Sequence, residues 1–164
     1  MKGNREKMDA LKLGNELTTR RYLFNKVQVS KALNVPDYIA MRIIMGTEES
    51  GDIYDGRTYL TDISDKMQIT IRQASKMISG LKDRGLVKWV HDGNGSEGTY
   101  VTITESGRQL FLQQEKMIKE FYEKVIEKFG EDNLVQLLNL MKQLETYMES
   151  EMEEMGLVDD ETVE

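Results

Sequence analysis

Apolar residues recur at helical spacing along the first part of the chain. The spacing predicts a long first helix from about residue 8 to residue 31, with apolar positions at Leu11, Leu17, Leu23, Phe24 and Val27. A second helix is expected to open at Asn34 and Pro36, because proline is favoured in the first turn of a helix. Its apolar residues are too numerous for an exposed helix: Ile39, Met41, Ile43, Ile44 and Met45. Residues 46–56 are polar and contain glycine, so we expect a loop there.

The pattern changes to shorter elements in the middle of the chain. Residues 58–60 form a short β-like triplet, and residues 61–67 predict a short helix with Thr61 as its N-cap. After a tight turn, Thr70 is expected to cap a third helix, and Gln73 is spaced to complete a capping box.

Two β-like segments and two long helices are expected in the second half. Residues 86–91 and 99–104 are rich in β-branched and aromatic residues and flank a glycine-rich stretch, which predicts a hairpin. Residues 105–129 and 132–155 have helical periodicity, with Gly130 as the stop between them. Their apolar stripes are too long for a lone helical arm, which favours a homodimer: Leu110, Met117, Phe121, Val125 and Phe129, then Leu134, Leu137, Leu138, Met141, Leu144 and Met148.

The order of elements predicts a mainly α fold with a small β-wing. A helix-turn-helix followed by a hairpin is a winged helix-turn-helix, which we place at residues 36–104. Residues 1–35 and 105–155 would supply the N- and C-terminal dimerisation helices, and residues 156–164 form an acidic tail.

The third helix separates into two faces. An apolar stripe is expected to be buried: Ile71, Ala74, Met77, Ile78 and Leu81. The other face carries residue types that reach base edges and phosphates, since arginine pairs with guanine and glutamine with adenine. The candidate DNA-binding residues are Thr70, Arg72, Gln73, Ser75, Lys76 and Ser79, with Lys88 and Asn94 in the hairpin. An ordinary solvated helix face is the alternative, but the turn upstream and the hairpin downstream favour DNA.

Charge is distributed unevenly, and this changes how the net value of −7 is interpreted. Residues 145–164 hold nine acidic residues and no basic one, so the remainder has 22 basic and 20 acidic residues, a net charge of about +2. The first 35 residues contain eight Lys or Arg against three Asp or Glu. A body of this charge permits binding to double-stranded DNA without indicating it.

Several kinds of chemistry lack support in the sequence. There is no cysteine, and His91 is the only histidine, so we expect neither a disulfide nor a metal site. Residues 93–98 spell G-x-G-x-x-G, but a strand follows where a dinucleotide site needs a helix, so we expect no cofactor. No nucleophile motif is present, so we expect no enzyme activity. Without a membrane span or an apolar signal core, a cytoplasmic protein with no membrane partner is expected.

Three segments of the chain resemble the MarR family of winged helix-turn-helix transcriptional regulators. They are Leu60-Thr61-Asp62-Ile63-Ser64-Asp65-Lys66-Met67, Leu81-Lys82-Asp83-Arg84-Gly85-Leu86-Val87 and Val101-Thr102-Ile103-Thr104-Glu105-Ser106-Gly107. Ile103 stands where the family usually has leucine, and the resemblance covers roughly residues 8–155. It implies a homodimeric regulator whose recognition helices enter successive major grooves about 34 Å apart. It also implies a small-molecule effector, bound where the dimerisation module meets the DNA-binding lobe.

Two positions depart from the family pattern. The family's wing commonly carries Asp-x-Arg, whereas here Asp92 is followed by no arginine and Glu97 would face phosphate with the wrong sign. Trp89 stands where a basic residue is frequent. These departures motivate an alternative, a winged-helix protein-interaction module with weak or no DNA binding. A third interpretation, a plasmid or phage replication factor, fits the long flanking helices less well.

Methionines raise a further question. The chain has eleven, and those on the second and last helices could line an adaptable ligand pocket or fill a helical core. The core is the more common use of such residues.

Overall fold

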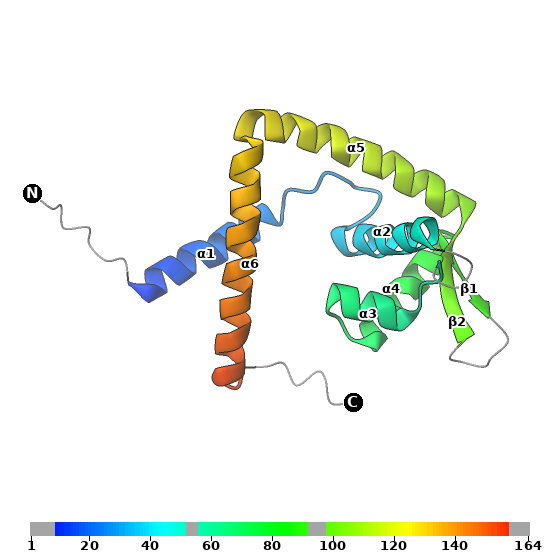
Figure 1. The fold of residues 1–164 in the computed structure, drawn as a ribbon, viewed down its shortest axis with the longest axis horizontal. Coiled ribbons are helices and arrows are strands. Elements are labelled where there is room, and N and C mark those ends of the chain that lie inside the picture. Colours follow the sequence, from blue (N-terminus) through cyan, green and yellow to red (C-terminus); the bar gives the residue numbers. More distant parts are fainter. Residues whose placement is uncertain (1–8, 52–55, 92–97, 158–164) are drawn as a thin grey trace, which may run out of the picture.

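Six helices and one two-stranded sheet make up the part of the chain that the computed structural model describes, residues 9–51, 56–91 and 98–157 (Figure 1). The helices are α1 Ala10–Phe24, α2 Val35–Ser50, α3 Leu60–Met67, α4 Ile71–Asp83, α5 Glu105–Phe129 and α6 Glu131–Glu154. The strands are β1 Val87–His91 and β2 Thr99–Ile103. The predicted fold class, mainly α with a small β-wing, is confirmed.

Helix α1 is shorter than predicted. Asp9 caps it by accepting a hydrogen bond from the Lys12 amide at 2.9 Å, but the helix ends at Phe24 rather than near residue 31. No residue of α1 is buried, whereas Ser30 and Leu33 in the following segment are. We call the unit formed by α2, α3, α4, the hairpin and the start of α5 the lobe. The chain leaves the helical path after Phe24, and the irregular segment that follows brings both of these side chains into the lobe.

Helix α2 begins as predicted and ends later. The Asn34 side chain accepts a hydrogen bond from the Asp37 amide at 2.8 Å, and proline lies in the first turn. Residues 46–50, predicted as loop, are helical. Glu48, in this added part of the helix, makes two tertiary contacts. Its carboxylate accepts a hydrogen bond from the Ile103 amide at 3.1 Å and forms an ion pair with Arg108 at 3.2 Å. These tertiary bonds outweigh the low helix propensity of Gly46.

Helices α3 and α4 form the helix-turn-helix. The prediction that Thr61 caps α3 is wrong: Tyr59 is the N-cap, and Asp62 accepts its amide hydrogen at 2.8 Å. Gln68, at φ 54°, makes the turn between the helices. The predicted capping box of α4 is confirmed, with Thr70 Oγ1 accepting from the Gln73 amide at 3.1 Å and Gln73 Oε1 accepting from the Thr70 amide at 3.0 Å.

The hairpin closes the lobe against the helices. β1 and β2 pair antiparallel, from Val87 opposite Ile103 to His91 opposite Thr99, and Thr58 adds a single bridge to Val101. The core draws on the lobe's helices, the hairpin and the start of α5: Leu33, Ala40, Met41, Ile44, Met45, Ile63, Ala74, Ile78, Leu81, Leu86, Val87, Val101, Ile103 and Phe111. Met41 and Met45 therefore fill core rather than line a pocket.

Two of the sequence segments quoted above meet at the base of the hairpin. Thr104 Oγ1 donates to the Gly85 carbonyl at 2.6 Å and accepts from the Gly107 amide at 3.0 Å, which caps α5. A Cβ on Gly107 would lie 2.0 Å from the Leu86 carbonyl oxygen. Glycine is therefore required at this crossing of α5 over the end of the helix-turn-helix.

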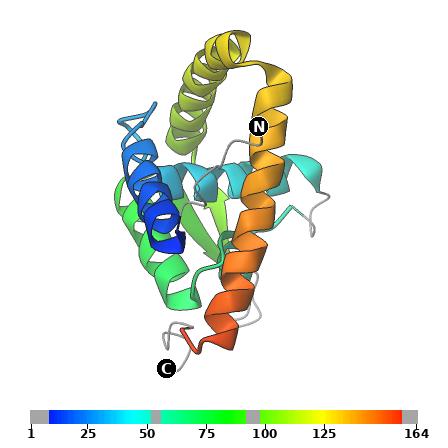
Figure 2. The same cartoon turned by 90° about the vertical axis from the view of Figure 1, so that its left-hand side faces the viewer.

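Helices α5 and α6 extend away from the lobe. Gly130, at φ 97°, separates them as predicted. Helix α5 leads from the hairpin to α6, whose direction crosses that of α1 (Figures 1 and 2), and residues of α1 and α6 line one hollow. None of the 24 residues of α6 is buried. Its exposed apolar residues include Val135, Leu137, Leu138, Leu140, Met141, Leu144, Tyr147, Met148 and Met152.

Candidate nucleic-acid interface

Helix α4 carries an exposed polar face. Ala74, Ile78 and Leu81 are buried and Met77 is half-buried, so the helix is anchored along the predicted stripe except at its first residue. Ile71 was expected in that stripe but is 53% exposed, because it is the first residue of α4 and lies at the end of the stripe. The anchoring turns the opposite side of the helix to solvent.

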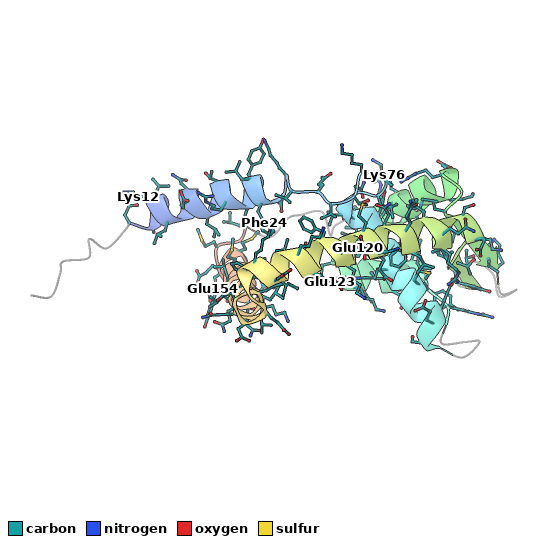
Figure 3. All side chains as sticks on the ribbon, turned by 90° about the horizontal axis from the view of Figure 1, so that it is seen from above. Lys12, Phe24, Lys76, Glu120, Glu123 and Glu154 are labelled. Carbon is teal, nitrogen blue, oxygen red and sulfur yellow. The ribbon has the colours of Figure 1, made fainter. Side chains whose placement is uncertain are left out.

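The predicted DNA-binding residues of α4 lie together. Arg72, Gln73, Lys76 and Ser79 are exposed, whereas Thr70 and Ser75 are half-buried. Figure 3 shows Lys76 on α4, away from α6, whose last residue is Glu154. The capping box holds the start of the helix, and its first free amides form the positive end of the helix dipole. Cationic and hydrogen-bonding groups therefore gather at one helix end.

Local bonds fix the angle between α3 and α4. Ser64 Oγ donates to the Ile69 carbonyl at 2.6 Å, and the Ile69 amide donates to the Ser64 carbonyl at 3.1 Å. Ser64 is buried, so these bonds are shielded from water. The orientation of the exposed face of α4 relative to α3 is consequently supported by two hydrogen bonds within the turn.

Lys88 lies apart from the other predicted residues. Successive side chains of a strand point to opposite faces, so Lys88 points away from the face that holds Val87 and Trp89. It lines an open hollow that also contains Glu48, Arg57 and Tyr100. The structure does not bring Lys88 to the exposed face of α4, and Asn94 lies outside the described residues, as do Asp92 and Glu97.

A second open hollow adjoins α4 and was not predicted. It lies between the start of α3, the end of α4 and the hairpin, and is lined by Tyr59, Leu60, Thr61, Lys82, Trp89, His91 and Thr99. The His91 ring Nδ1 and Thr99 Oγ1 are 2.8 Å apart. Lys82, in the last turn of α4, lies inside a segment already quoted for the family resemblance, but only the folded hairpin reveals that it shares a hollow with Trp89 and His91.

A third hollow, of about 420 Å³, lies between the segment preceding α2, α2 itself and α5. Val29, Leu33, Tyr38, Arg42 and Tyr122 are among its lining residues. Tyr38 stacks on Phe111 with ring centroids 5.3 Å apart, and burial together with nearby Glu115 raises the pKa of its hydroxyl. An apolar wall with one arginine and two phenols suits a small aromatic or anionic molecule.

The described residues contain neither a metal-binding cluster nor a membrane-spanning helix. Residues 9–51, 56–91 and 98–157 contain no group of three or more His, Asp or Glu side chains placed to hold a metal ion. Within these ranges no helix has the length and hydropathy needed to cross a membrane.

Known proteins were compared with the chain. No protein-family model and no curated protein matches its sequence. Among solved structures, the MarR family regulator NMB1585 from Neisseria meningitidis matches with a TM-score of 0.62 at 20% identity, over 87% of this chain and 94% of that chain. The transcriptional regulator PcaV from Streptomyces coelicolor, in complex with its natural ligand, matches with a TM-score of 0.62 at 16% identity, over 85% and 93%. S. aureus MepR in complex with DNA matches with a TM-score of 0.59 at 15% identity, over 87% and 99%. The chain therefore has the winged helix-turn-helix fold of MarR-type transcriptional regulators.

Proposed function

We propose that this protein is a sequence-specific DNA-binding transcriptional regulator of the MarR type, acting as a homodimer and without catalytic activity. The observation that carries the proposal is the exposed polar face of α4. The buried stripe on the opposite side of the helix turns this face to solvent, and a capping box begins the helix. The fold shared with MepR, which was solved with DNA, supports it.

The N-terminal half of α4 would enter the major groove. Arg72, Gln73 and Lys76 would then lie nearest the base edges, with Thr70, Ser75 and Ser79 closer to the phosphates. Gln73 already uses Oε1 in the capping box, so its side-chain nitrogen is the part directed to a base. Lys88 and Asn94 would contribute from the wing through the phosphate backbone.

A second copy of the chain would cover the terminal helices. Helix α6 buries no residue within the chain although it carries a long apolar stripe. Water-exposed apolar area on this scale is typical of a protein interface. In this scheme residues 1–35 and 105–155 form the dimerisation module and residues 36–104 form the DNA-binding unit.

The hollow between α2 and α5 would hold a small effector. It lies at the junction between the lobe and the terminal helices, and its lining combines Arg42 with Tyr38 and Tyr122. PcaV, which has the same fold, was solved with its natural ligand.

The test is binding of the purified protein to its own upstream promoter DNA over a salt series, with a shuffled duplex as control. We expect tight binding to the promoter that weakens steeply with salt, because Lys and Arg contacts release counterions. Equal or absent binding to both duplexes would instead favour the winged-helix interaction module. That alternative is motivated by the arginine-free wing and the net charge of −7.

A further inference from the structure

The segment between α1 and α2 makes specific contacts with two other helices. Ser30 is buried, and its hydroxyl donates a hydrogen bond to the buried side-chain carbonyl of Gln114 on α5. The same Ser30 oxygen accepts the Leu33 amide hydrogen at 3.2 Å. Residues 30–33 therefore form a tight turn, named here the Ser30 turn, that is attached to α5.

Arg84 attaches the other side of the Ser30 turn to α4. Arg84 is the C-cap of α4, and its Nη2 donates to the Ala32 carbonyl at 2.7 Å. Its Nη1 lies 4.0 Å from the carboxylate of Asp37 in the first turn of α2. The side chain of Arg84 is 45% exposed, so the longer ion pair contributes little, and the hydrogen bond to Ala32 is the shorter of the two contacts.

The Ser30 turn thus has two faces with different neighbours. Ser30 and Leu33 line the hollow between α2 and α5 on one side, and Ala32 receives Arg84 on the other. The four residues of the Ser30 turn therefore lie between two parts of the molecule. On one side are the hollow and α5, a proposed dimerisation helix, and on the other is the C-terminal end of α4, the helix proposed to read DNA. A shift of the turn would move the Ala32 carbonyl to which the Arg84 guanidinium is bonded.

We propose that Arg84 is a positioning residue for DNA recognition: through Ala32 it sets α4 relative to the Ser30 turn and α5. The inference rests on the proposed DNA-binding function but assigns Arg84 no contact with DNA. Loss of Arg84 leaves every base-contacting side chain present and lets the recognition helix change its angle. Specific binding then falls more than non-specific binding, because only base readout depends on that angle.

The test compares Arg84→Ala with Lys119→Ala, a matched control that removes an exposed cation from α5. Arg84→Ala is expected to weaken promoter binding about tenfold, with little effect on the shuffled duplex. The slope of affinity against salt stays that of the parent, and Lys119→Ala behaves as the parent in both respects. A slope lower by about 0.9, with both duplexes weakened alike, would identify Arg84 as a phosphate contact and overturn the proposal.

Ser30→Ala provides a second variant that changes no charge. It releases the turn from Gln114, so it is expected to weaken promoter binding in the same direction, about threefold. The double variant Ser30→Ala/Arg84→Ala should bind no more weakly than Arg84→Ala alone, since both changes act through one contact. Additive losses would show that the two residues act separately and would contradict the proposal.

Hydrogen exchange tests the link without DNA. Ser30→Ala is expected to speed amide exchange in the last turn of α4, residues 80–84, while the first turn of α4 and the hairpin stay as in the parent. Unchanged exchange there overturns the proposal, even if the parent binds its promoter. If the parent fails to bind any promoter, the proposed function fails, and faster exchange at 80–84 still supports the structural link.

Discussion

The lobe and the last helix, α6, differ in how their apolar side chains are covered. In the lobe, the apolar positions of α4 reach Met41, Ile44 and Val101 in a shared core, and Ala74 and Ile78 are fully buried. Helix α6 carries apolar residues along its 24 residues and buries none of them. Apolar residues at helical positions are therefore covered within the chain in one region and left exposed in the other. The lobe is therefore packed by contacts within the chain, whereas α6 would be covered by the second copy proposed above.

A cavity in the lobe should produce the largest effect. Ile78→Ala is expected to lower the free energy of unfolding by about 2–5 kcal/mol, because a fully buried side chain loses its contacts and leaves a void. Urea unfolding followed by circular dichroism measures it. Ile71→Ala, on the same helix but exposed, is the control, and equal losses for the two variants would contradict the lobe core described above.

A charge on α6 should separate association from folding. Leu138→Lys is expected to weaken the dimer by about 2 kcal/mol or more, because each interface would bury two unpaired ammonium groups. Sedimentation equilibrium gives the dissociation constant. The melting temperature of the lobe, measured on protein dilute enough for the dimer to dissociate, should be little changed. Gln143→Lys, away from the stripe, should keep the parent's association. A parent that is monomeric at micromolar concentration would remove the basis for the comparison.

Substitutions on the exposed face of α4 should affect only DNA binding. Arg72→Ala is expected to cost about 1–3 kcal/mol in promoter affinity if it pairs with a guanine, and Lys76→Ala should cost less and reduce the salt slope. Fluorescence anisotropy with labelled promoter DNA measures both. Dimerisation should remain that of the parent, and retention of full affinity by both variants would show that α4 is not the recognition helix.

The smallest effect concerns Asp37, at the seam between the lobe and the first segment. Burial raises the pKa of its carboxyl, and the nearby Arg84 offsets this only in part. The ionised form is therefore disfavoured in the folded state, so stability is lost as the pH rises from 3.8, its ordinary value, through the raised pKa. Asp37→Asn should raise the free energy of unfolding at pH 7 and give no gain at pH 3.

Urea unfolding at both pH values tests this prediction, with Asp65→Asn on the exposed side of α3 as the control. A loss of stability in Asp37→Asn at pH 7 would mean that pairing with Arg84 outweighs burial, contrary to the direction expected here.

Local signals in the sequence predicted much of the lobe. The Thr70 and Gln73 spacing identified the start of α4, Asn34 and Pro36 identified the start of α2, and the glycine at 130 separated α5 from α6. These features depend on hydrogen bonds within four residues, which sequence spacing encodes directly. The candidate residues on α4 could be placed on one face for the same reason, because helical periodicity alone determines the face.

Other boundaries could not be predicted because distant contacts set them. The first helix stops at Phe24 so that Ser30 can reach Gln114, 84 positions away, and α2 continues to Ser50 because Glu48 bonds Ile103 and Arg108. No local pattern carries that information. Lys88 likewise belonged to the candidate site by composition, yet strand alternation turned it to the other side of the hairpin.

The sequence by itself determined which segments become helices and strands, and which face of each is apolar, since periodicity and capping act over a few residues. The tertiary structure decided which apolar faces are covered within the chain and where α1 and α2 end. It also decided that Arg84 donates a hydrogen bond to the Ala32 carbonyl. These outcomes depend on the three-dimensional path of the backbone, because a hydrogen bond between residues 52 positions apart exists only once the elements between them have packed.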